Sequence, residues 1–131
     1  MAAKTKFVVK LLPNEKKAVR EFLAAMNLAY GGVIQSASLF GSKARGDWTQ
    51  DSDIDIVLVV AGDDHQIRRE MIHLLSEIEL NYDVLLDVRV ISAERWQYYA
   101  DIKAGLYQNI TRDAVPIRMY KKRINSLSRA G

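Results

Sequence analysis

Apolar side chains recur along the chain at two spacings, one typical of helices and one typical of buried strands. Between residues 14 and 30 they recur every three or four positions, which places them on one face of a helix. Pro13 and Asn14 give this helix a start signal, with Asn14 as its expected N-cap. Gly31-Gly32 gives it a stop, because glycine readily takes the positive φ that ends many helices.

Three further segments are predicted as strands. Residues 33–40 form a short segment bounded by turn signals, and residues 83–91 have the pattern of another strand. Residues 54–61 are β-branched and almost wholly apolar, which favours a central strand that is covered on both faces. A second amphipathic helix lies between the last two strands, and its apolar stripe consists of Ile67, Met71, Leu74, Leu75 and Ile78.

The end of the chain is predicted to hold a shorter helix and one extended piece. Ser92 is the expected N-cap of this helix, which carries Trp96, Tyr99 and Tyr107. Such aromatic residues are more often part of a core or an interface than of a ligand site. Residues 115–119 form the last extended segment. The whole order predicts an α/β fold of the α+β type, in which helices flank a small mixed β-sheet.

Composition agrees with one ordinary globular domain. Apolar residues make up 49% of the 131 positions and charged residues 27%, so we expect residues 1–131 to form a single domain. The chain has no cysteine, which excludes disulfides, thiolate zinc ligands and a thiol nucleophile and fits a cytoplasmic protein. No apolar stretch approaches the roughly 20 residues of a membrane span, and the N-terminus is too basic for a signal peptide.

The net charge of +3 is not spread evenly, because basic residues gather at the C-terminus. Residues 120–131 form a basic tail that contains Lys121, Lys122, Arg123 and Arg129. A tail of this kind is typical of a solvated, frayed terminus, although it can also contact nucleic acid or an acidic partner.

The polar segment after the first predicted strand has the residues of a phosphate-binding turn. Gly41 lets the backbone approach a ligand, because glycine has no Cβ. Ser42 follows where a helix or turn would begin, so backbone N–H groups and its hydroxyl can face phosphate oxygens. Lys43 and Arg45 add positive charge nearby. This segment is therefore a candidate nucleotide-binding site.

Three residues in or near this turn also have ordinary structural interpretations. Lys43 and Arg45 could form salt bridges with Asp47 or Asp51 instead of contacting a ligand. Trp48 could stack on a base, or it could pack against a neighbouring helix as a loop tryptophan.

Two carboxylates follow at the start of the central strand. Asp53 and Asp55 are two positions apart, so their side chains leave the strand on the same face. Two such charges at about 4 Å repel by about 1 kcal/mol in water and by more in a protein. A divalent cation between them removes this cost, and carboxylate oxygens favour Mg²⁺ or Mn²⁺. The alternative is a pair of exposed acids at the turn before a strand.

A third carboxylate is expected from the next strand. Asp87 interrupts an otherwise apolar segment that must lie beside the strand of Asp55, and a lone charge in a buried strand is costly unless it is paired or metal-bound. Asp83 has the same strand parity, but it lies at the entrance of the strand, where exposure explains it. We therefore favour Asp87 as the third member of the site.

The combination of these motifs resembles the DNA polymerase beta-type nucleotidyltransferase superfamily. The resemblance is carried by Gly41-Ser42, by the Asp53-x-Asp55 pair and by Asp87 on a later strand. The chain is also similar to the minimal nucleotidyltransferase branch in two segments, Gly-Ser-Lys-Ala-Arg-Gly-Asp at residues 41–47 and Ser-Asp-Ile-Asp at residues 52–55. The similarity covers residues 33–91 well, and the segment after residue 105 is similar to the end of such domains.

This resemblance implies a metal-dependent transfer of a nucleoside monophosphate, with AMP from ATP as the expected donor. Two Mg²⁺ ions, or Mn²⁺, would be bound by Asp53 and Asp55 and bridge the triphosphate, and Asp87 would help to bind the catalytic metal and to deprotonate the acceptor hydroxyl. Pyrophosphate would leave from the α-phosphorus. The implied nucleotide-binding residues are Gly41, Ser42, Lys43 and Arg45.

The resemblance also implies a partner. Minimal nucleotidyltransferases commonly pair with a helical HEPN-type protein, which they modify as the antitoxin of a toxin–antitoxin pair. One alternative is a catalytically inactive module that binds a nucleotide or a partner, and Asp87 discriminates between the two. Another alternative is a small-molecule transferase of the aminoglycoside type, for which a homo-oligomer would have to supply the missing helical part. We do not expect a nucleic-acid acceptor, since the chain has no nucleic-acid-binding domain.

Overall fold

The computed structural model describes residues 11–47 and 52–118, and within these ranges it confirms a mixed α/β fold. The predicted basic tail, residues 120–131, lies outside the described residues. None of the helices in the described ranges has the length and apolar character that a membrane crossing needs. The elements, in chain order, are α1 (Pro13–Tyr30), β1 (Ile34–Phe40), α2 (Gly41–Arg45), β2 (Ile54–Val60), α3 (His65–Tyr82), β3 (Leu86–Ser92), α4 (Ala93–Asp101), α5 (Gly105–Asp113) and β4 (Val115–Pro116).

The four strands form one mixed sheet in the order β3-β2-β1-β4. Strand β2 pairs in parallel with β3 and antiparallel with β1, and β4 adds a short antiparallel strand beyond β1. As predicted, β2 is central and buried along its length except at Asp55. Strand β3 is an edge strand, with β2 as its single strand neighbour in the described sheet.

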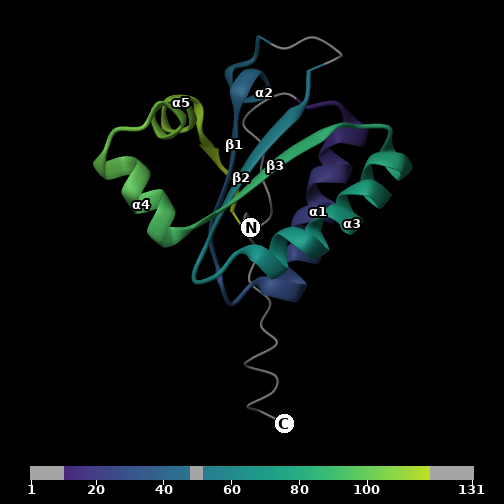
Figure 1. The fold of residues 1–131 in the computed structure, drawn as a ribbon. Helices are drawn as coiled ribbons and strands as arrows, with labels where there is room; N and C mark the ends of the chain where they lie inside the picture. Colours follow the sequence, from purple (N-terminus) through teal and green to yellow (C-terminus); the bar gives the residue numbers. More distant parts are fainter. Residues whose placement is uncertain (1–10, 48–51, 119–131) are drawn as a thin grey trace.

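Helices cover both faces of the sheet, and the alternation of side chains along the strands explains why (Figure 1). On β2, Ile54, Ile56 and Leu58 point into the main core, where α1 and α3 pack. Val57 points to the opposite face and joins a smaller core beneath α4 and α5. The residues with the parity of Val57 therefore lie on the same face as α4 and α5.

Helix α1 begins one residue earlier than predicted, and its N-cap is Leu12, not Asn14. Glu15 takes over part of the capping, because its Oε1 accepts a hydrogen bond of 2.8 Å from the backbone N–H of Leu12. The side chain of Asn14 instead donates to the carbonyl oxygen of Tyr82 at 2.8 Å and so ties α1 to the end of α3.

The predicted positive φ at the end of α1 is wrong, since Gly31 has φ −55° and stays in the right-handed region. Glycine is needed there for space, because an added Cβ would overlap the backbone and side-chain oxygens of Asn27. The start of β3 is also later than predicted. Asp83 is the C-cap of α3 in the left-handed region, with φ 55°, which aspartate tolerates better than most residues.

The segment after β3 folds into two helices where one was predicted. Ser92 is the N-cap of α4, as predicted, and its hydroxyl accepts a hydrogen bond of 3.1 Å from the N–H of Arg95. Lys103, with φ 54°, lies in the turn that separates α4 from α5. Tyr107 is therefore in α5, and its ring lies 4.8 Å from that of Trp96 between centroids. These aromatics belong to the smaller core and its surroundings.

The cap at Ser92 gives a direct test of how α4 is held. Replacing Ser92 with Ala removes the acceptor for the Arg95 N–H, so the free energy of unfolding should fall by about 1 kcal/mol. Ser92→Asp keeps an acceptor and adds a favourable charge at the helix N-terminus, and it should retain the stability. Urea denaturation of the three proteins measures the difference. Equal losses in both variants would mean that the hydrogen bond is not what matters.

Candidate active site

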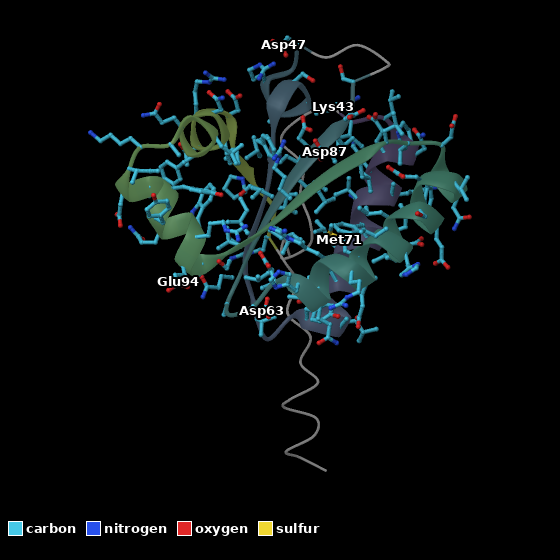
Figure 2. The ribbon with its side chains drawn as sticks, viewed as in Figure 1. Lys43, Asp47, Asp63, Met71, Asp87 and Glu94 are labelled. Atoms are coloured by element: carbon cyan, nitrogen blue, oxygen red, sulfur yellow. The ribbon has the colours of Figure 1, made fainter. Side chains whose placement is uncertain are left out.

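The parallel pairing of β2 with β3 places two of the three predicted carboxylates beside each other. Asp55 and Asp87 are direct register partners, and they have the side-chain parity of the face that carries α4 and α5. Asp53 immediately precedes β2 and is exposed. Figure 2 shows Asp87 at the end of the sheet where α2 begins. The structure thus brings Asp55 and Asp87 together, with Asp53 at the mouth of the same site.

Burial and neighbouring negative charge together mark this cluster electrostatically. The pKa of Asp55 is raised to about 6, first by burial and then by the charge of Asp87 and a hydrogen bond with it, with a smaller contribution from Asp53. Arg89 acts in the opposite direction. Paired acids that resist ionisation together are the donor set that a divalent cation stabilises, so the residues present fit the predicted metal.

Gly41 lies against these carboxylates, which explains why the position must be glycine. Its neighbour Phe40 is the register partner of Asp55, and Gly41 takes φ 75° directly after it. A Cβ at Gly41 would collide with the carboxylate of Asp55. Ser42 follows as the second residue of α2. The predicted phosphate-binding turn therefore abuts the acidic cluster, and its ligand-binding role stays a prediction.

Lys43, which was predicted to bind the nucleotide, lies buried in an ion pair with α1. Its side chain is fully buried, and its Nζ lies 2.7 Å from Oε2 of Glu15, which is itself buried in α1. Lys43 was predicted to bind the nucleotide or to pair with a nearby aspartate. The structure shows its ion pair with Glu15, and its role in nucleotide binding stays a prediction. The pair anchors α2, and hence Gly41 and Ser42, to α1.

Arg45, at the end of α2, forms surface ion pairs. Its Nε lies 3.2 Å from Oδ2 of Asp47, which confirms the salt-bridge alternative for this residue, and its Nη1 lies 2.9 Å from Oδ2 of Asp113 in α5. The guanidinium is partly exposed, so a role in nucleotide binding stays a prediction. Asp51 and Trp48 lie outside the described residues.

The sequence-based prediction missed one cation on the carboxylate face. Arg89 is two positions after Asp87 and therefore lies on the same face of β3, and its charge acts on Asp55. The alternation of a strand was the signal that could have identified it. Asp87 and Arg89 also line a groove of about 610 Å³ that runs along β3 between α3 and the pair α4 and α5.

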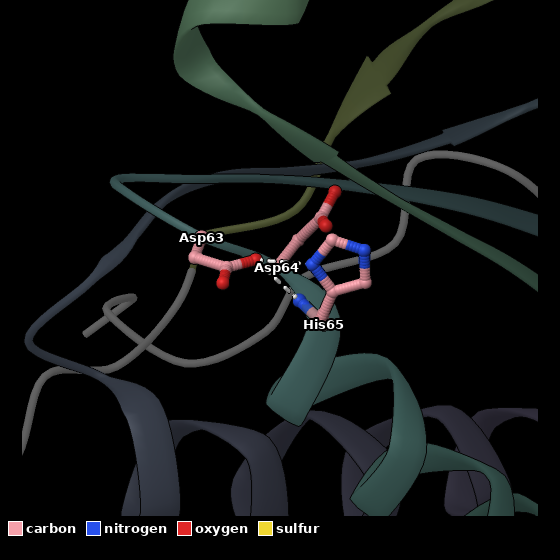
Figure 3. Close-up of side chains that lie close together, drawn as sticks. All are labelled: Asp63, Asp64 and His65. Carbon is pink, nitrogen blue, oxygen red and sulfur yellow. Dashed lines mark hydrogen bonds and ion pairs between the residues drawn. The ribbon is translucent and has the colours of Figure 1, made fainter.

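A second acidic group, drawn in Figure 3, lies away from this site, as the positions of Asp63 and Asp87 in Figure 2 show. Asp63, Asp64 and His65 offer ligand atoms within 4.8 Å of one another and could hold a metal ion. Other contacts already occupy them, because His65 Nδ1 lies 2.6 Å from Asp63 Oδ1 and Arg68 forms an ion pair with Asp64 at 3.2 Å. Asp64 Oδ2 is buried and makes no hydrogen bond to the described residues, although Arg68 balances its charge. The group follows the far end of β2, about 20 Å of strand from Asp55.

Comparison with known proteins gives the family. The model of the nucleotidyltransferase domain matches residues 16–117, which include all three carboxylates. The chain belongs to the nucleotidyltransferase domain family. This membership confirms the resemblance to minimal nucleotidyltransferases and the predicted class of enzyme.

Individual relatives agree with this assignment. A Methanocaldococcus jannaschii protein, named as a predicted protein adenylyltransferase, is 37% identical over 95 residues, covering 68% of this chain and 91% of that protein. A second protein of that organism with the same description is 29% identical over 69 residues, covering 52% of this chain and 70% of its own. A crystal structure of a toxin–antitoxin with AMP-PNP superposes with a TM-score of 0.49 and 18% identity, over 89% of this chain and 80% of that one.

The buried ion pair between Lys43 and Glu15 can be tested by a mutant cycle. Lys43→Met keeps most of the side-chain volume but leaves the Glu15 carboxylate buried without its partner, so the free energy of unfolding should fall by about 3 kcal/mol. Glu15→Gln added to Lys43→Met removes the second charge and should recover part of this loss. Urea denaturation of the wild type, both single variants and the double variant measures the coupling. A double variant as unstable as the sum of the single variants contradicts the assignment.

The raised pKa of Asp55 predicts that the site destabilises the metal-free fold. The unfolded chain loses this proton near pH 4 and the folded chain near pH 6, so stability falls as the pH rises through this window and the full penalty is present above it. Asp55→Asn should therefore stabilise the protein by about 1 kcal/mol at pH 8, given partial solvent screening, and hardly at all at pH 4. Thermal unfolding in EDTA at both pH values tests this, and an equal shift at both contradicts it.

Proposed function

We propose that this protein transfers AMP from ATP to a hydroxyl group on a partner protein. The observation that carries the proposal is the register pairing of Asp55 with Asp87 directly against the Gly41 turn. The two adjoining carboxylates offer oxygen ligands for a divalent cation. The turn at Gly41, a residue without a Cβ, offers backbone N–H groups for phosphates. Family membership supports the reaction class.

The proposed step is an in-line displacement at the α-phosphorus. A bond forms between the acceptor oxygen and the α-phosphorus, while the bond from the α-phosphorus to the bridging oxygen breaks and pyrophosphate leaves. The carboxylate of Asp87 accepts the proton of the acceptor hydroxyl and later releases it to solvent. Gly41 and Ser42 hold the terminal phosphates through backbone N–H groups and the serine hydroxyl.

Asp53, Asp55 and Asp87 would hold the metal, for which we propose Mg²⁺. The bound ions would neutralise the charge that develops on the phosphate oxygens. Without them, burial and then the charge of Asp87 raise the pKa of Asp55 to about 6. The metal therefore also relieves a cost that these residues impose on the fold.

For the acceptor we propose a small helical protein of the HEPN type, with this chain as the antitoxin. The names of the two Methanocaldococcus jannaschii relatives, which describe protein adenylyltransferases, support a protein acceptor. The helical HEPN partner rests on the resemblance to minimal nucleotidyltransferases. A cytoplasmic location is part of the same proposal.

Incubation with α-labelled ATP, Mg²⁺ and the protein encoded by the neighbouring gene tests the proposal. We expect label on the partner and one pyrophosphate released for each AMP transferred. Asp87→Asn should reduce the transfer rate by at least about a hundredfold, because it removes the group that receives the proton. Asp63→Asn is the matched control, and it should transfer at the wild-type rate because Asp63 lies beyond the far end of β2.

The two variants also separate the alternatives. Full biological protection by Asp87→Asn would show that the chain acts by binding its partner and not by catalysis. Loss of transfer in Asp63→Asn would move the metal site to the group around His65. Absence of label with any of the four NTPs and with either Mg²⁺ or Mn²⁺ would contradict the proposed activity.

A further inference from the structure

The groove along β3 is open on the edge of the sheet. Its floor is the strand itself, from Leu86 to Ile91, and its walls come from α3 on one side and from α4 and α5 on the other. In Figure 1, β3 crosses in front of β2 between these two groups of helices. An edge strand in an open groove exposes backbone groups that can pair with another chain.

The hydrogen-bond register shows which backbone groups point outward. Ile54 N–H donates to the carbonyl of Leu85 at 3.0 Å, and the parallel register that follows directs the odd-numbered residues of β3 toward β2. The even-numbered residues therefore point their N–H and C=O groups toward the groove. Val88 is the middle one of these.

Two of the outward groups beside Val88 are already satisfied by side chains. Glu79 Oε2 accepts from the N–H of Leu86 at 3.0 Å, and Arg68 donates to the carbonyl oxygen of Val90 at 3.0 Å. Among the described residues, none bonds to the N–H and C=O of Val88 on this side. One outward group on either side of Val88 is thus occupied, and at Val88 itself the edge is open, where one short extended segment can pair.

The charge around the opening is positive. Arg89 and Arg95 line the groove from β3 and α4, and Asp87 is the single acid among its lining residues. Arg68 lines it from α3 but is paired with Asp64. Apolar walls from Met71, Leu75 and Tyr99 complete it. Backbone donors and acceptors together with apolar walls fit an extended peptide, and the arginines fit acidic side chains on that peptide.

We propose that an acidic, extended segment of the acceptor protein pairs with β3 at Val88, so that its hydroxyl residue lies opposite Asp87. Neighbouring strands are about 4.8 Å apart, and register partners point to the same face. A side chain opposite Asp87 therefore continues the row that Asp55 and Asp87 begin, with its hydroxyl next to the carboxylate that takes the proton. This inference rests on the proposed function, because it uses Asp87 as the reacting end of the groove.

Binding can be measured without any transfer reaction. The probe is a fluorescent random copolymer of glutamate and tyrosine, followed by anisotropy in the absence of ATP, with a lysine–tyrosine copolymer as the charge-reversed probe. We expect the acidic probe to bind and the basic probe not to bind. Arg95→Glu should weaken binding about fivefold or more, while Arg69→Glu, an equal charge change on the exposed part of α3 outside the groove lining, should leave it within twofold.

Val88→Pro tests the backbone pairing. Proline removes the outward N–H of Val88 without removing a bond to β2, since that N–H points away from β2, and edge strands tolerate proline at such positions. We expect binding to weaken about tenfold while the circular dichroism spectrum keeps its wild-type form. If this variant does not fold, Arg95→Glu and its control still decide the question.

Three outcomes would overturn the inference. They are equal binding of both copolymers, equal weakening by Arg95→Glu and Arg69→Glu, and displacement of the acidic probe by a single-stranded oligonucleotide at equal charge concentration, which would indicate a nucleic-acid groove. The binding assay is independent of catalysis. Failure of AMP transfer with intact probe binding therefore contradicts the proposed function alone, whereas transfer with no probe binding contradicts the groove alone.

Discussion

The parallel register between β2 and β3 is the constraint on which the rest of the site depends. It sets Asp55 beside Asp87, and it turns Arg89 to the same face two positions later. A shift of β3 by one residue would move Asp87 to the opposite face, among the apolar side chains that pack under α1 and α3. The register also leaves the backbone of Val88 outward, so the carboxylate face and the open edge have a single structural origin.

The buried apolar side chains of β2 stabilise this register, whereas the carboxylates at its start destabilise the fold. Nearly every side chain of β2 is buried, which fixes the strand firmly between its neighbours. Near the start of β2, however, Asp55 is half-buried beside Asp87, and its pKa is raised to about 6. The fold therefore stores electrostatic repulsion at one end of a strongly apolar strand. A cation and a triphosphate bound there would release it, which links ligand binding to stability.

A second charge pair holds the other half of the site in place. Glu15 accepts the N–H of Leu12 with one oxygen and the ammonium of Lys43 with the other, so one carboxylate caps α1 and anchors α2. The removal of a partner from such a buried pair costs more than the pair itself contributes to stability. The position of Gly41 against Asp55 thus depends on a contact between elements that are distant in sequence.

The sequence by itself determined most of the elements and the neighbouring positions of Asp55 and Asp87, because side-chain periodicity is local. Periodicity identified α1, α3 and the central strand, and the lone charge of Asp87 in an apolar segment indicated a neighbour for Asp55. Arg89 followed from the same alternation and was missed. Only the tertiary structure decided the partner of Lys43, the cap of α1 by Glu15 and the open edge at Val88. These depend on which segments pack together, and the spacing of residues along the chain does not encode that.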